Sequence, residues 1–100
     1  MFEAATEACE MIADETRTSL DSDRKLSLAL VRLLEIVGEA AASVSQEQQS
    51  QLAKIPWRSM IGMRNRIIHA YFDVDLDIVW QTITEDLPPL VNELERILTE

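Results

Sequence analysis

Apolar residues recur at steps of three and four along most of this chain, which is the spacing of one face of an α-helix. Only two glycines and three prolines interrupt the 100 residues, and 47% of the residues are hydrophobic. Aromatic residues and threonines, which strands favour, are scarce. The sequence therefore predicts an all-α protein, a helical bundle that forms a single domain over residues 1–100.

Two helices are predicted in the first half of the chain. One runs from about residue 2 to residue 18, and the polar residues 18–23 favour a turn after it. The second begins at Arg24, and Gly38 inside it predicts that another backbone passes close by, because glycine costs roughly 1 kcal/mol relative to alanine in a helix. Its apolar surface is wide enough to face a second subunit as well as the core. This surface comprises Leu26, Leu28, Leu30, Val31, Leu33, Leu34, Val37, Ala41 and Val44.

Two more helices are predicted in the second half. Residues 45–56 are polar and indicate a connection with a short helical turn, after which a third helix covers residues 57 to about 70. The last helix begins with Asp75 as its cap. Pro88 and Pro89 interrupt its hydrogen bonds, but the apolar phase is the same on both sides, which predicts a kink or two nearly collinear helices.

The distribution of charge is uneven. The net charge is −9, which would repel nucleic acid if it were spread evenly over the surface. Between Glu47 and Asp73, however, there is no acidic residue, and four cations make the interval +4. The other five cations and eighteen carboxylates leave −13 for the rest. The four cations are Lys54, Arg58, Arg64 and Arg66. Two interpretations stay open, an anion-binding site and a basic helix face that pairs with acidic neighbours.

Several classes of protein are excluded by simple counts. No run approaches the ~20 apolar residues that span a bilayer, and the amino terminus carries Glu3, Glu7 and Glu10 where a secretory signal would be basic. Cys9 is the only cysteine, so no disulfide within the chain and no cysteine-based metal cluster can form. We expect a cytoplasmic protein without a membrane partner or a cofactor.

Arg64 is the most unusual residue of the predicted third helix. A guanidinium within an apolar arc must reach water, a carboxylate or an anionic ligand, because burying it unpaired is costly. Glu35 and Glu39 are the candidate partners for a structural ion pair. The apolar arc around it comprises Trp57, Met60, Ile61, Ile67, Ile68, Tyr71 and Phe72.

His69 lies on a different face of that helix, in a polar line with Arg58, Gly62 and Asn65. A lone histidine is more often structural than catalytic, but beside arginines it could exchange protons with a ribose hydroxyl or a leaving oxygen of RNA. Arg64 and His69 are five residues apart, about 140° around a straight helix. Either the helix breaks near Ala70, or a two-fold partner supplies the second set of groups.

These residues resemble the signature of the HEPN superfamily, an arginine followed by four residues, a histidine, one residue and a tyrosine. The stretch Ile61 to Asp75 is similar to that of HepT-like toxins. The likeness extends to Leu33-Leu34-Glu35-Ile36-Val37-Gly38-Glu39-Ala40 and to Asp77-Ile78-Val79-Trp80 and Glu85-Asp86-Leu87-Pro88, so it covers nearly the whole chain.

The resemblance implies a homodimeric up-and-down bundle of four to five helices with the two motif copies lining a cleft. It implies a toxin of a toxin-antitoxin pair that cleaves RNA without a metal, with Arg64 and His69 as catalytic residues and Asn65 positioning them. It also implies a minimal nucleotidyltransferase antitoxin that transfers AMP to Tyr71. The remaining cations of the basic interval, expected to bind substrate, are Lys54, Arg58 and Arg66.

Alternatives to this nuclease remain. Asp73, Asp75 and Asp77 could suggest a metal site, but capping of the following helix is the better interpretation, and His69 has no second histidine to complete a zinc site. The chain could instead be a non-catalytic module that binds a nucleotide or the nucleotidyltransferase. It could also be a purely structural dimer with Arg64 paired to Glu35 or Glu39.

Overall fold

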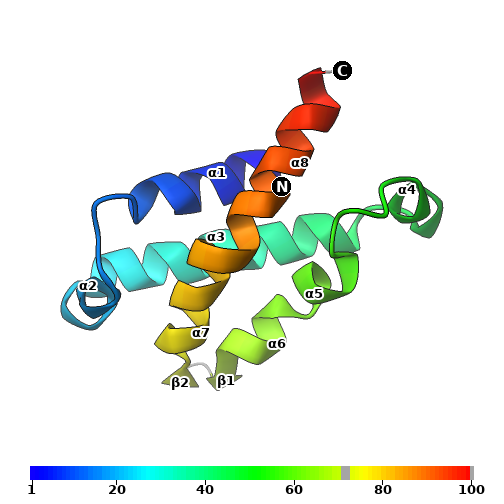
Figure 1. Ribbon diagram of the computed structural model, residues 1–100. Helices are drawn as coiled ribbons and strands as arrows, with labels where there is room; N and C mark the ends of the chain where they lie inside the picture. The colour runs from blue at the N-terminus through cyan, green and yellow to red at the C-terminus, as the bar shows by residue number, and fades with distance from the viewer. Residues whose placement is uncertain (71–72, 100) are drawn as a thin grey trace.

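The fold is helical, as predicted. The computed structural model describes residues 1–70 and 73–99, with the backbone alone at positions 69 and 70. A two-stranded antiparallel hairpin, which composition argued against, is the exception within those ranges. The elements in chain order (Figure 1) are α1 (Phe2–Met11), α2 (Arg17–Ser22), α3 (Arg24–Ala42), α4 (Gln46–Gln51), α5 (Trp57–Ile61), α6 (Met63–Ile67), β1 (Ile68–Ala70), β2 (Asp73–Val74), α7 (Leu76–Gln81), the π-helical turn η1 (Thr82–Asp86) and α8 (Leu87–Thr99).

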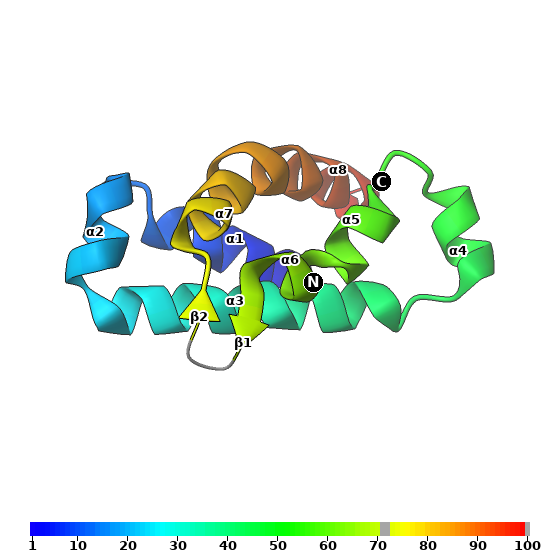
Figure 2. The same cartoon turned by 90° about the horizontal axis from the view of Figure 1, so that it is seen from below.

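Helix α3 is the central element, and α1, α5, α6 and α7 all contact it. It begins where predicted, with Asp23 as a cap whose Oδ1 accepts from the Leu26 N–H at 3.1 Å. Figure 2 shows α3 along one face of the molecule, with α7 and α8 along the opposite face. The shortest dimension is 17 Å, so the fold is about two helices thick. Helices therefore cover α3 from one side, and on its outer side Leu28 is 56% exposed while Val31 is half-buried.

The core comes mainly from leucine, valine and alanine side chains of α1, α3 and α8, with methionines from α5 and α6. Cys9 is half-buried beside it, with its Sγ 3.9 Å from the Ile83 carbonyl oxygen, and burial raises the pKa of its thiol. No helix in the described ranges is long and apolar enough to cross a membrane.

The prediction of one helix over residues 2–18, with a turn over 18–23, is wrong. Helix α1 ends at Met11, and residues 17–22 form α2 instead of a turn. Thr16 caps α2, and its backbone N–H donates to Ser19 Oγ at 3.1 Å. The same polar side chains that favour a turn can therefore begin a helix, and here they do.

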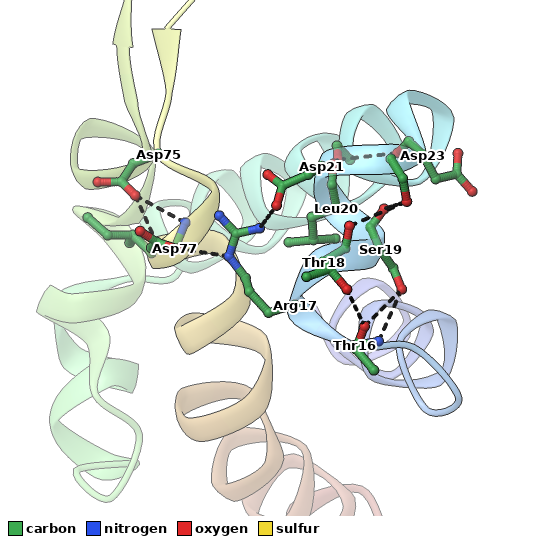
Figure 3. A network of polar contacts seen from close by, with 12 residues as sticks. Thr16, Arg17, Thr18, Ser19, Leu20, Asp21, Asp23, Asp75 and Asp77 are labelled. Atoms are coloured by element: carbon green, nitrogen blue, oxygen red, sulfur yellow. Dashed lines mark hydrogen bonds and ion pairs between the residues drawn. The ribbon is translucent and has the colours of Figure 1, made fainter.

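Arg17 ties α2 to the start of α7 (Figure 3). Its Nε donates to Asp77 Oδ1 at 2.8 Å, and its Nη1 lies 3.2 Å from Asp21 Oδ2. The hydrogen bond to Asp77 is the main reason why the pKa of Arg17 is raised. Asp75 Oδ1 accepts from the N–H groups of Asp77 and Ile78, so the predicted cap of the last helix is confirmed. These contacts fix the position of the first turn of α7, which directly follows the hairpin.

The predicted third helix is shorter than expected and is divided. It breaks at Gly62, between α5 and α6, and it ends at Ile67 rather than near Ala70. Ile68 is extended, with φ −107° and ψ 108°, and the Asp75 N–H donates to the Ile67 carbonyl oxygen at 2.8 Å. That long-range bond joins the end of α6 to the start of α7. In the hairpin between them, Ile68 pairs with Val74 and Ala70 with Asp73.

Two predictions about irregular positions are confirmed. A Cβ at Gly38 would lie 3.1 Å from the Met60 carbonyl oxygen, so the backbone of α5 does pass close to α3 there. Near Pro88 and Pro89, the Leu87 N–H donates to the carbonyl oxygen of Thr82, five residues earlier. The π-helical turn accommodates the missing proline N–H groups, and α7 and α8 continue nearly in line (Figure 1).

Candidate functional site

Arg64 lies on the outer face of α6. Its neighbours Met63 and Ile67 are buried, whereas Arg64, Asn65 and Arg66 are exposed. The side chain of Arg64 is 59% exposed, so it reaches water, as the sequence required of a guanidinium among apolar residues. The predicted apolar arc itself is partly wrong, because Ile61 is 42% exposed and Met63, which was not assigned to the arc, is buried. That prediction assumed one straight helix, and the break at Gly62 changes which residues face the core.

A carboxylate lies next to Arg64. Its Nε is 3.7 Å from Glu35 Oε2, so the candidate partner Glu35 is confirmed. The same carboxylate oxygen lies 3.8 Å from Arg32 Nη1, and that nitrogen is 3.9 Å from Glu39 Oε1. Glu39 therefore pairs with Arg32. All three distances exceed that of a hydrogen bond, so these are loose ion pairs, in which Arg32, Arg64 and Glu39 are largely exposed and Glu35 is 23% exposed.

Arg64 borders an open hollow between α3, α6 and the hairpin. The hollow has a volume of about 260 Å³. Its lining combines apolar side chains with one carboxylate and two guanidinium groups, namely Leu28, Val31, Ile68, Val74, Glu35, Arg32 and Arg64. A second hollow of about 480 Å³ shares Leu28 and Val74 with it and extends toward α2. The two hollows are thus neighbours beside α3, and charged residues of both signs line each of them.

His69 lies in β1, directly after Ile68, which lines the same hollow as Arg64. The register of the hairpin is irregular between Ile68 and Ala70, so His69 occupies the point where the regular pairing is interrupted. The break between α6 and β1 removes the 140° separation that a continuous helix would impose on Arg64 and His69. The side chain of His69, and Tyr71 altogether, lie outside the described residues.

The other predicted site residues are dispersed. Arg66 Nη2 donates to the Ser59 carbonyl oxygen at 3.1 Å, so Arg66 reaches back to α5, where Arg58 is exposed. Lys54 lines a separate hollow of about 220 Å³ with Glu93 and Arg96 of α8. Lys54 therefore lies at a different hollow from Arg64, and the cations of the basic interval do not all line one site. Asn65 is exposed beside Arg64 on α6.

Arg32 is the residue that sequence reasoning missed. It lines the hollow with Arg64, and its side chain is 62% exposed. The sequence feature that could have identified Arg32 is its spacing from Glu35 and Glu39, which places all three residues on one face of a helix beside the apolar Leu28. That face was interpreted only as a wide apolar surface.

The carboxylates near the hairpin are used structurally. Asp75 caps α7, and Asp77 accepts from Arg17. Among the side chains that the structure describes, which leave out those of residues 69–72 and 100, no group of three or more from histidine, cysteine, aspartate or glutamate could hold a metal ion.

Comparison with known proteins identifies the family. A family model described as "Ribonuclease HepT-like" matches residues 1–97. The chain belongs to this HepT-like family. A Thermococcus cleftensis protein named "Probable ribonuclease HepT" is 38% identical over 100 residues, which span 96% of this chain and 91% of the relative. The HepT-like resemblance of the sequence is thereby confirmed.

Other relatives have similar coverage. A Methanocaldococcus jannaschii protein named "Putative RNase" is 30% identical over 97 residues, which span 97% of this chain and 89% of the relative. A Caldanaerobacter subterraneus protein, also named "Putative RNase", is 34% identical over 101 residues, which span 97% and 90%. No solved structure matches the chain.

Proposed function

We propose that this HepT-like protein is an endoribonuclease that cleaves RNA without a metal ion, with Arg64 and His69 as its catalytic residues. The observation that carries the proposal is the exposed guanidinium of Arg64 at an open hollow whose lining includes Ile68, the neighbour of His69. The relatives named as ribonucleases support RNA as the substrate class.

The chemistry needs only groups that the chain and its substrate supply. His69 accepts the proton of a ribose 2′-hydroxyl, and the 2′-oxygen attacks the adjacent phosphorus. The bond from phosphorus to the 5′-oxygen breaks, which leaves a 2′,3′-cyclic phosphate on one product and a 5′-hydroxyl on the other once that oxygen is protonated. Arg64 stabilises the negative charge that builds up on the phosphate oxygens, and Asn65 helps to position Arg64 and His69. Because the nucleophile belongs to the RNA, no metal-bound hydroxide is required.

The proposed active site is duplicated in a homodimer. The outer side of α3 offers a surface for the second copy, because Leu28 is largely exposed there and Val31 is half-buried beside it. Leu28 and Val31 also line the hollow that Arg64 borders, so a second copy on this surface would lie beside Arg64. Pairing two such faces would place both motif copies along one cleft, and the second copy of His69 could protonate the leaving 5′-oxygen.

We further propose that the protein is the toxin of a toxin-antitoxin pair. Its antitoxin is a minimal nucleotidyltransferase that transfers AMP to Tyr71, two residues after His69. A bulky anion at that position would repel the RNA phosphate and block the cleft. Intact mass after co-expression with the antitoxin would show the added AMP, which should be lost in Tyr71→Phe.

The decisive test is RNA cleavage in the presence of EDTA. Purified wild type should cut total RNA under these conditions, and His69→Ala and Arg64→Ala should each lose about 100-fold or more in rate. Arg96→Ala, which removes the same charge from α8, should stay within a few-fold of wild type. Activity that EDTA abolishes, or that both motif variants keep, would refute the mechanism.

A further inference from the structure

Arg32 is a candidate for a role in substrate binding. We propose that Arg32 binds the phosphate backbone of RNA together with Arg64, so that two arginines from different helices form one anion-binding site. This inference rests on the proposed function, because the ligand is the RNA that Arg64 and His69 would cleave. It extends that function by adding a residue outside the motif.

The two guanidinium groups are close to each other. Arg32 Nη1 and Arg64 Nε lie 3.8 Å and 3.7 Å from the same oxygen, Glu35 Oε2. The two nitrogens are therefore at most about 7.5 Å apart, the sum of those distances. Two N–H···O hydrogen bonds of about 2.9 Å made to opposite sides of a phosphate span a similar length. A single phosphate can thus contact both arginines.

Glu35 allows the two arginines to lie close together and still leaves N–H groups on both of them available to a ligand. Its carboxylate offsets the repulsion between two nearby cations, and it is the more buried partner, 23% exposed. The contacts to it are longer than hydrogen bonds, so both guanidinium groups retain N–H donors for a ligand. Both arginine side chains are more than half exposed, so a ligand can reach them.

The surroundings also fit a phosphodiester. The lining of the hollow carries Arg32 and Arg64 against the carboxylate of Glu35, and Glu39, outside the lining, lies 3.9 Å from Arg32. Leu28, Val31, Ile68 and Val74 supply the rest of the lining. Both guanidinium groups are more than half exposed, so salt screens their attraction for a phosphate, and binding should depend on salt concentration.

The test measures RNA binding separately from cleavage. A fluorescent single-stranded RNA is titrated, in EDTA and at several salt concentrations, with His69→Ala protein and with the same protein carrying Arg32→Ala. Loss of one phosphate contact should lower the slope of log K against log salt by about 0.7 and weaken binding at low salt. The matched control is Lys25→Ala, an exposed cation on the same helix that does not line the hollow.

Arg32→Lys adds a second criterion. It keeps the charge, so it should restore the salt slope while recovering only part of the affinity, because lysine lacks the planar fork of donors. Sedimentation of each variant shows whether its oligomeric state has changed. A loss of self-association without a change in RNA binding would place Arg32 in a protein interface and overturn the proposal.

The outcomes separate the two proposals. If the His69→Ala protein binds no RNA at any salt concentration, the proposed nuclease fails, and the role of Arg32 fails with it. If that protein binds RNA and Arg32→Ala behaves like Lys25→Ala, the nuclease stands and only the role of Arg32 is refuted.

Discussion

Replacing Arg64 by alanine distinguishes a structural arginine from a functional one. The ion pair with Glu35 has an N to O distance of 3.7 Å, and the Arg64 side chain is mostly solvated. Exposed pairs of this kind contribute up to about 1 kcal/mol to the free energy of unfolding. Glu35 also keeps a cation when Arg64 is removed, because Arg32 Nη1 remains 3.8 Å from the same oxygen. We therefore expect Arg64→Ala to lower stability by less than about 1 kcal/mol.

This magnitude can be measured against a core variant. In a domain of this size, 1 kcal/mol corresponds to a shift in Tm of about 4–8 °C. Leu34 is 1% exposed on the inner side of α3, and Leu34→Ala should cost about 2–5 kcal/mol. Thermal and urea melts followed by circular dichroism would compare both variants with wild type. All samples should have the same protein concentration, because self-association makes Tm depend on concentration.

The comparison has a clear negative outcome. If Arg64→Ala destabilises the protein as much as Leu34→Ala does, Arg64 is part of the structural framework, and its exposure is no argument for a ligand. If it leaves Tm nearly unchanged while RNA cleavage is lost, the arginine is present for function.

Two further predictions concern other parts of the fold. Gly38→Ala should lower the free energy of unfolding by about 1 kcal/mol, because the added methyl group would lie 3.1 Å from the Met60 carbonyl oxygen. This cost should exceed the gain from alanine as the better helix former. Urea melts that show a stabilised variant would contradict this prediction. The hydrogen bond from Arg96 is the main cause that lowers the pKa of Glu93. The ionised Glu93 therefore stabilises the fold at pH values above its ordinary pKa, and this stabilisation is lost as the pH falls through the lowered pKa. The difference in Tm between wild type and Glu93→Gln should accordingly shrink in acid, and a difference that grows below pH ~4 would refute the assignment.

Features encoded by neighbouring residues were predictable. The caps Asp23 and Asp75 accept hydrogen bonds from backbone groups within three residues, so their positions follow from local sequence. The prolines of the last helix likewise have a local effect: they lack the N–H groups that would donate to carbonyl oxygens one turn earlier, which is where the π-helical turn is found. Gly38 was informative because a glycine within a long helix usually has a packing reason, and here that reason is the backbone at Met60.

Features that depend on distant contacts were predicted incorrectly. The third helix ends at Ile67, where the carbonyl oxygen accepts the N–H of Asp75 from beyond the hairpin, and periodicity alone ran it to Ala70. The predicted helix divides at Gly62, and beyond it Met63 and Ile67 are buried while Arg64 is 59% exposed, a burial pattern that the straight-helix arc did not give. At the amino terminus, the contact of Arg17 with Asp77 ties α2 to α7, which no pattern within residues 2–18 indicates.

The sequence by itself determined the helical class, the extent of α3, the caps and the motif that contains Arg64 and His69, because these depend on side chains and hydrogen bonds within a turn or two. Only the tertiary structure decided where the motif helix ends and which groups surround Arg64. Arg32 and Arg64 are 32 residues apart, and they share one carboxylate because α3 and α6 pack against each other. Such a contact depends on how the helices pack in the folded chain, which hydrophobic periodicity does not specify.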